Sequence, residues 1–183
     1  MVLNKTRVRA ALAVIGLAIA GVLAMVALGG CSSTQAQTAS TGGAGRVSIA
    51  NPSAQVDPTT LSAQVNGDTV SIPLSQVTSK YNTRFAIAGP DGQMSYMAYV
   101  WNGTVTVRAD ICPPCGSRSF KLTKGTLVCN SCGTVFDAVT GKGKSGYCIR
   151  YSKQPVTYQV SGDNIIMKMS DLVTAYRGTL NPS

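Results

Sequence analysis

The stretch from Ile111 to Cys148 reads ICPPCGSRSFKLTKGTLVCNSCGTVFDAVTGKGKSGYC and holds five of the chain's six cysteines. Two C-x₂-C pairs are separated by thirteen residues, and a fifth cysteine follows sixteen residues after the second pair. A glycine comes directly after each pair, which is typical of a tight turn that lets two thiolates face one metal. Two such knuckles joined by a hairpin predict a tetrahedral, all-thiolate site. The predicted metal ligands are Cys112, Cys115, Cys129 and Cys132.

Other uses of these cysteines stay open. An exported domain can form disulfides, but five cysteines remain after Cys31 and one would lack a partner. A redox-active dithiol at Cys112 and Cys115 requires a helix that starts at the motif, and the sequence Gly-Ser-Arg-Ser that follows is a poor helix start. Cys148 is a candidate for an additional ligand, a redox thiol or a residue that guards entry to the site, and the spacing does not select it as a ligand. The spacing alone does not distinguish zinc from an iron–sulfur cluster.

The 183-residue chain contains no His and no Glu, and its seven acidic residues are all Asp. This composition excludes His-ligated haem, Rieske centres, mixed Cys/His zinc fingers and Ser-His or Cys-His catalytic pairs. The net charge is +9, and the local basic cluster surrounds the cysteines. We interpret the cluster as a solvated rim or as a docking face for an acidic partner or anionic headgroups, and not as a nucleic-acid site. Its members are Lys121, Lys124, Lys142, Lys144, Arg150 and Lys153.

The N-terminus has the layout of an export signal. Three basic residues within positions 5–9 precede an uncharged apolar run that continues to Gly30. The ending Leu-Gly-Gly-Cys resembles a bacterial lipobox, in which Cys31 would receive lipid. An uncleaved membrane anchor is the alternative, because about 20 apolar residues can span a bilayer. Either way, positive residues stay inside and the rest of the chain faces the extracytoplasmic side of the cell membrane.

These features divide the chain into three parts. Residues 1–30 are the lipoprotein signal peptide or anchor. Residues 31–48 are rich in Ser, Thr, Gln, Ala and Gly, which predicts a flexible tether. Residues 49–183 form the β-rich metal-binding domain.

Within this domain, alternating apolar residues and turn signals predict short antiparallel strands. Asn102-Gly103 is typical of a type I′ hairpin turn, and it delivers the chain through a return strand to Cys112. Pro73 places the first strand at a sheet edge. Only a short helical turn, from Ser170 to Tyr176, is expected. The predicted strands are 69–77, 84–88, 93–101, 104–109, 119–122, 127–129, 134–136, 155–160 and 165–169.

The pattern indicates an all-β fold, either a small β-sandwich or a partly open barrel of antiparallel hairpins, with a two-knuckle, four-cysteine insertion of the zinc-ribbon or rubredoxin-like type. An internal echo accompanies it, because residues 66–81 align with 161–176 at an offset of 95. We interpret the echo either as two hairpins with similar turns or as a pseudo-symmetric pair of strands that frames the cysteine loops.

Several motifs occur together in one order. They are Ile-Pro-Leu-Ser-x-Val at 72–77, Arg-Ala-Asp at 108–110 before the first knuckle, Val-Cys-x-x-Cys-Gly-x-x-Phe at 128–136, and a late cysteine. In this the chain resembles the FtrD-like membrane iron–sulfur proteins over roughly residues 68–172. The resemblance implies an iron–sulfur or other metal site at the four knuckle cysteines, with Cys148 close by. It also implies a role in iron uptake or envelope redox systems. Around Cys148 the chain departs from the family's Gly-Gly-Cys-Asn-Pro pattern.

Three functions follow from these observations. The first is a membrane-tethered electron-transfer protein with an iron–sulfur cluster, whose partner is a membrane redox or metal-transport protein. The second is a binding or scaffold lipoprotein in which Zn²⁺ only holds the fold. The third, a thiol oxidoreductase, is the weakest because no acid–base pair assists the cysteines. Asp110 and Asp137 flank the knuckles and are expected to cap turns.

Overall fold

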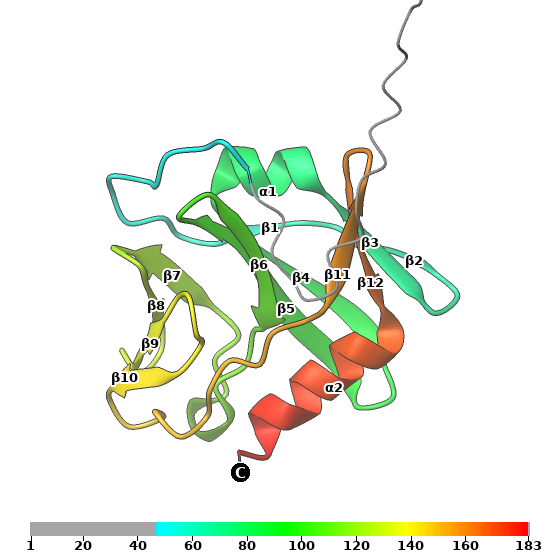
Figure 1. Cartoon of the computed structure of the whole chain (residues 1–183). Helices are drawn as coiled ribbons and strands as arrows, with labels where there is room; N and C mark the ends of the chain where they lie inside the picture. The colour runs from blue at the N-terminus through cyan, green and yellow to red at the C-terminus, as the bar shows by residue number, and fades with distance from the viewer. Residues whose placement is uncertain (1–46, 183) are drawn as a thin grey trace, which may run out of the picture. The chain divides into compact units, whose positions relative to one another are not determined.

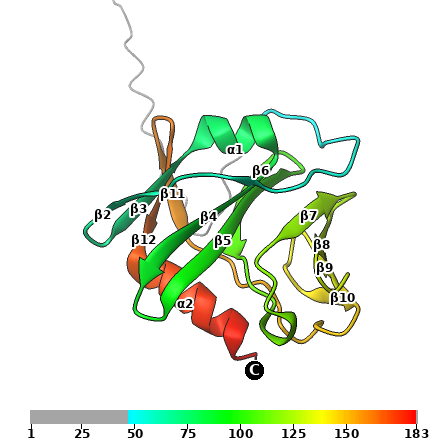
Figure 2. The ribbon, with the colours of Figure 1, turned by 180° about the vertical axis from the view of Figure 1, so that it is seen from behind.

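The computed structural model describes residues 47–182, which fold into three four-stranded sheets and two α-helices (Figures 1 and 2). All strand pairs are antiparallel except one, β1 with β4, and none of the described sheets closes into a barrel. The predicted antiparallel β architecture is therefore confirmed. The predicted export segment and residues 31–46 of the tether lie outside the described residues. Among residues 47–182, no helix is long and apolar enough to span a membrane.

The central sheet has the order β1-β4-β5-β6 and packs on both faces. Its strands are β1 (Thr59–Thr60), β4 (Asn82–Gly89), β5 (Gly92–Trp101) and β6 (Thr104–Ala109). On β5, Met94, Tyr96, Ala98 and Val100 enter the main core, as their alternation predicted. The intervening Met97 and Tyr99 enter a second core that contains cysteines. Strand β5 is thus buried on both sides, and the same sheet supports the main core and the second core that contains cysteines.

The β5–β6 hairpin turns at Asn102 and Gly103, whose φ angles of 51° and 66° are both positive. A type I′ turn requires positive φ at both central residues, so the turn prediction is confirmed.

The second sheet, β11-β12-β3-β2, joins the two halves of the internal echo. Each half is a hairpin followed by a helix. The first half is β2 (Gln64–Asn66), β3 (Thr69–Pro73) and α1 (Leu74–Lys80), and the second is β11 (Tyr158–Ser161), β12 (Asn164–Lys168) and α2 (Met169–Leu180).

The two halves are related by a local two-fold axis. In the β3–β12 pairing, Ser71 lies opposite Ile166, and these residues are 95 positions apart, which is the offset of the echo. The Leu74 N–H donates to the Asp163 carbonyl at 2.8 Å, and the equivalent Met169 N–H donates to the Asp68 carbonyl at 2.7 Å. The echo is therefore a pseudo-symmetric pair of β-β-α units.

Three sequence predictions in this region are wrong. The strand expected over residues 69–77 ends at Pro73, where helix α1 begins, and β3 lies inside its sheet between β12 and β2. Pro73 fits because it is the last residue of the strand, and its φ of −68° suits the approach to a helix. The helical turn expected up to Tyr176 is a twelve-residue helix that continues to Leu180.

The third sheet, β10-β9-β8-β7, belongs to a segment that we call the metal lobe, residues 111–153 (Figure 1). Its elements are a 3₁₀ turn (Pro113–Cys115), β7 (Phe120–Thr123), β8 (Thr126–Cys129), β9 (Val135–Asp137) and β10 (Gly143–Ser145). Strand β10 is absent from the strands that the sequence predicted.

The two ends of the metal lobe lie side by side at its base. The Ala109 N–H donates to the Gln154 carbonyl at 3.1 Å, and Arg108 forms a bridge with Pro155. The buried Arg108 guanidinium also donates to the carbonyls of Lys153 at 2.7 Å and Val139 at 2.6 Å. The lobe therefore begins at the end of β6, and its two ends are held together by hydrogen bonds.

Candidate metal centre

The first knuckle follows β6 directly. Cys112 is extended, and Pro113 and Pro114 start a 3₁₀ turn that ends at Cys115. The N–H groups of Cys115 and Gly116 both donate to the Cys112 carbonyl, at 3.2 Å and 2.8 Å. Gly116 is left-handed, with φ of 69°, a conformation that costs glycine little. The glycine after the first pair therefore has the turn-making role that the sequence predicted.

The second knuckle repeats this geometry at the end of β8. The Gly133 N–H donates to the Cys129 carbonyl at 3.0 Å, and Gly133 has φ of 68°. Cys129 is the last residue of the strand, and Cys132 lies in the turn that leads to β9. The β7–β8 hairpin between the knuckles turns at Lys124 and Gly125, both with positive φ.

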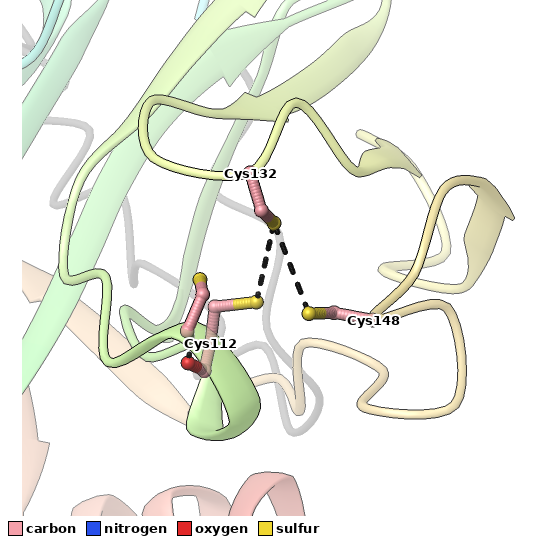
Figure 3. Close-up of side chains that lie close together, drawn as sticks. Cys112, Cys132 and Cys148 are labelled. Carbon is pink, nitrogen blue, oxygen red and sulfur yellow. Dashed lines mark hydrogen bonds between the residues drawn. The ribbon is translucent and has the colours of Figure 1, made fainter.

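All five cysteines of the lobe gather at one place. The sulfurs of Cys112, Cys115, Cys132 and Cys148 all lie within 4.8 Å of one another. The Cys132 Sγ is 3.9 Å from the Cys112 Sγ and 3.8 Å from the Cys148 Sγ, and Figure 3 shows it facing both. The remaining cysteine, Cys129, places its Sγ 3.7 Å from that of Cys115.

The group of four differs by one member from the set that the sequence suggested. Three predicted ligands, Cys112, Cys115 and Cys132, belong to it, and its fourth member is Cys148 rather than Cys129. Both candidates touch the site, so the five thiols offer one more sulfur than a tetrahedral ion uses. The predicted lipidation site, Cys31, lies outside the described residues.

The donor set fits a thiophilic metal. Zinc and iron–sulfur clusters are the centres that proteins bind with four thiolates. Four sulfurs at tetrahedral corners about 2.3 Å from one ion are separated by about 3.8 Å. The closest sulfur–sulfur distances here, 3.7–3.9 Å, match that value. They exceed the disulfide length of about 2.05 Å, and all five cysteines are free.

Thr134 organises one side of the site. Its Oγ1 lies 3.1 Å from the Cys132 Sγ and accepts the Cys148 N–H at 3.1 Å. Burial alone would raise the pKa of Cys132, but the hydroxyl and backbone N–H of Thr134, with neighbouring thiols, lower it to about 6. Burial raises the pKa of Cys112 and Cys129. The site therefore holds one thiol that ionises readily beside others that need a counter-charge.

Lys153 supplies a buried positive charge, which the sequence did not reveal. We expected it at a solvated basic rim, but it is 1% exposed. Its ammonium donates to the Ile111 carbonyl at 2.6 Å and lies 4.4 Å and 5.0 Å from the ring centroids of Phe136 and Phe120. Burial lowers the pKa of Lys153 to about 8, against the opposing effect of the thiolates of Cys112 and Cys129. An ammonium placed this way stabilises negative charge on the cysteines.

The two aspartates beside the knuckles behave differently. Asp137 caps a turn as expected, because its Oδ1 accepts the N–H groups of Val139 and Thr140. The same expectation is wrong for Asp110, which is 1% exposed and whose carboxylate oxygens accept no hydrogen bond from residues 47–182. The Arg84 Nε lies 3.7 Å away. Burial raises the pKa of Asp110 to about 6, more than the nearby cations lower it.

Comparison with known proteins adds one finding. A family model described as membrane iron–sulfur-containing protein, FtrD-like, matches residues 78–177. This span begins in α1, ends in α2 and includes all five cysteines of the metal lobe. No curated protein and no solved structure matches the chain.

Proposed function

We propose that this chain is an electron-transfer protein whose metal lobe holds an iron–sulfur centre. The reason is that the chain belongs to the FtrD-like family of membrane iron–sulfur-containing proteins. The observation that carries the choice of iron–sulfur is the family match over residues 78–177, which include all five cysteines of the lobe. The convergence of four free cysteine sulfurs within 4.8 Å supports a metal site of some kind at this place. Such a site has only thiolate donors, which iron–sulfur centres prefer. We further propose that the carrier serves a membrane redox or metal-transport protein in an iron-uptake or envelope redox system.

The ligands that we propose are Cys112, Cys115, Cys132 and Cys148. Thr134 supports this choice, because one hydroxyl contacts the Cys132 sulfur and accepts the Cys148 N–H. Cys129 then lies beside the site as a fifth thiol, 3.7 Å from Cys115. The set suggested by the knuckles alone, with Cys129 in place of Cys148, is the competing assignment.

The chain's own residues suit a one-electron carrier. An iron–sulfur centre supplies the reversible one-electron chemistry when it is bound. Cys112 and Cys148 are buried, which limits solvent access to that side of the centre, while Cys115 is exposed. Lys153 offsets part of the thiolate charge from within the core. Burial, hydrogen bonds to sulfur and nearby charge are the means by which a protein sets the reduction potential of such a centre.

We also propose that the chain is tethered to the membrane, with its metal lobe on the extracytoplasmic side. The basic start, the apolar run and the lipobox-like ending at Cys31 support a lipid anchor. Replacement of Cys31 by Ser should leave an unprocessed, larger species that labelled fatty acid does not modify. Unchanged mobility together with unchanged membrane association would favour an uncleaved anchor.

A structural zinc site is the second candidate. The separations of 3.9 Å and 3.8 Å from the Cys132 sulfur to those of Cys112 and Cys148 favour it, because sulfurs that share a single ion lie about 3.8 Å apart. In this role Zn²⁺ would hold the lobe together and the protein would act as a scaffold or binding lipoprotein.

One experiment separates the two candidates. The full chain is expressed with ample iron and sulfide and is purified anaerobically in detergent, and its iron, zinc and acid-labile sulfide are measured beside its absorption spectrum. We expect a brown protein whose visible bands bleach on addition of dithionite. A colourless protein with one zinc and no iron would refute the electron-transfer proposal.

A further inference from the structure

The charge of the described chain is divided sharply between the metal lobe and the rest. Within residues 111–153 there are seven basic residues and one acidic residue, Asp137. Residues 47–110 and 154–182 together have five basic and six acidic residues. The lobe therefore has a net charge of +6, whereas the remainder has −1. A charge of this size on a small part of the surface steers association with partners of opposite sign.

This positive charge is largely available to a partner. Lys124, Lys142, Lys144 and Arg150 are exposed. The single acid, Asp137, is already engaged, because its Oδ1 accepts the N–H groups of Val139 and Thr140. Its contact with Lys144, at 3.8 Å, is long and solvent-exposed, so it leaves that ammonium largely free to interact.

Apolar side chains are exposed within the same basic segment. Of the four large hydrophobic residues that are exposed among residues 47–182, three lie in the lobe, namely Val139, Tyr147 and Ile149. Tyr147 is 86% exposed and Ile149 is 43% exposed. They flank Cys148, which is fully buried. An aromatic and an aliphatic side chain with basic neighbours have the composition of an interface, with an apolar centre and a charged rim.

The loop that presents these residues is firmly packed. Gly143 pairs with Phe136, and a side chain at Gly143 would collide with the Ile149 backbone. The Cys148 N–H is fixed by the Thr134 hydroxyl at 3.1 Å. Tyr147 and Ile149 are therefore held outward over the cysteine site by an ordered backbone, which lowers the entropy that binding must overcome.

We propose that Lys142, Lys144, Tyr147, Ile149 and Arg150 form a docking face for an acidic redox protein. The inference rests on the proposed electron-transfer function and names the partner class and the place of exchange. In the exchange one electron passes between the partner's redox group and the centre beneath Cys148. One group is oxidised and the other is reduced, and no covalent bond forms or breaks. A lipid surface matches the charge but offers no electron donor or acceptor, so a protein is the better partner.

Binding is tested first, with the full chain held in neutral phosphatidylcholine nanodiscs. The probe is a purified acidic flavodoxin, and a basic c-type cytochrome is the matched control. We expect flavodoxin to bind and the cytochrome not to bind. Raising the salt to about 0.5 M should weaken flavodoxin binding by about tenfold or more, because exposed charges are then screened.

Variants locate the face. The double charge reversal K142E/R150E should weaken flavodoxin binding by at least about tenfold, whereas K80E/K168E makes the same charge change at exposed lysines outside the lobe and should alter it less than about twofold. Replacement of Tyr147 and Ile149 by Ala should weaken binding while leaving its salt dependence unchanged. Circular dichroism verifies that each variant is folded. Equal losses in the two charge-reversal pairs would overturn the proposal.

Two further readouts separate this inference from its premise. Flavodoxin binding is measured on the zinc-loaded and the iron-loaded protein, so the docking face is tested even where no electron transfer occurs. Stopped-flow transfer from reduced flavodoxin should slow in K142E/R150E in parallel with binding. If nanodiscs with phosphatidylglycerol protect residues 142–150 from hydrogen exchange while flavodoxin fails to bind, the face is a membrane contact and the proposal is wrong.

Discussion

The Cys148 sulfur lies 3.8 Å from the Cys132 sulfur, although sixteen residues separate them in the chain. This contact makes Cys148 the preferred fourth ligand, and a pair of matched variants tests the preference. Cys148→Ser should lower the Co²⁺ affinity of the metal-free protein by at least about 100-fold, since even an outer-shell partner is worth about 10–100-fold. Cys129→Ser should lower it by less than about tenfold.

The measurement is a Co²⁺ titration that follows the thiolate-to-metal charge-transfer band. A larger loss of Co²⁺ affinity in Cys129→Ser than in Cys148→Ser would make Cys129 the fourth ligand, as the two C-x₂-C pairs predicted. Equal, severe losses would mean that both thiols are needed.

Lys153 should set the electrostatic environment of the centre. Lys153→Met removes the buried ammonium but keeps most of the packing volume, so the added negative charge of the reduced centre is less well stabilised. The reduction potential should fall by on the order of 60 mV, which corresponds to about 1.4 kcal/mol for a one-electron couple. Protein-film voltammetry measures the shift. Lys144→Met, at a side chain that is 54% exposed, is the control and should shift the potential far less. Similar shifts in both variants would indicate a long-range effect of net charge.

Asp110 should make the protein less stable as the pH rises. Its pKa is about 6 in the folded protein against 3.8 for an unperturbed aspartate, so the folded state holds the proton more tightly. Stability is therefore highest below about pH 4 with respect to this group and falls as the pH rises to about 6. The difference between these two pKa values lowers the free energy of unfolding by roughly 3 kcal/mol at neutral pH. Asp110→Asn should be more stable than the wild type near pH 7.5 and similar to it near pH 4.

Urea unfolding of both proteins at the two pH values gives the comparison. Asp137→Asn is the opposite control, because backbone hydrogen bonds lower the pKa of Asp137 and that variant should lose stability at neutral pH. A less stable Asp110→Asn at the higher pH would show that the interaction with Arg84 outweighs the cost of burial.

Asp163 should stabilise the start of α1. Its Oδ1 accepts the Ser75 N–H at 2.8 Å, and its Oδ2 accepts the Ser75 hydroxyl at 2.6 Å. Asp163→Ala should lower the free energy of unfolding by about 1–2 kcal/mol, the usual loss for a helix cap. Among residues 47–182, the carboxylate of its symmetry equivalent, Asp68, accepts a hydrogen bond only from the neighbouring Thr69 hydroxyl, at 3.5 Å, so Asp68→Ala should cost less than half as much. Thermal unfolding of the two variants measures both losses. Equal losses of stability would contradict the role of Asp163 as the cap of α1.

Features that depend on neighbouring residues were predictable from the sequence. The Asn102-Gly103 turn, the alternating faces of β5 and the glycine after each C-x₂-C pair all follow from local chemistry. The sequence missed α1 because the apolar alternation of β3 runs on to Leu74. The helix start is instead satisfied by Asp163, which is 88 residues away from Ser75.

The same limit applies at the metal centre. The burial of Lys153 depends on Phe120 and Phe136, which come from strands β7 and β9 of the lobe. The approach of Cys148 depends on Thr134, which lies fourteen residues earlier. Neither contact leaves a local signal in the sequence, because both arise when distant segments pack together.

The hydrogen-bonded base of the metal lobe determines how well the lobe tolerates insertions in its sequence. The lobe leaves and rejoins the sheets at Ala109 and Gln154, which are joined by a backbone hydrogen bond of 3.1 Å. The entropy of closing a loop depends only weakly on its length, about 0.6 kcal/mol for each doubling. Insertions within the lobe should therefore be tolerated as long as this base and the cysteines stay in place. The paired β-β-α units have no such freedom, because every residue of β3 is matched to one of β12.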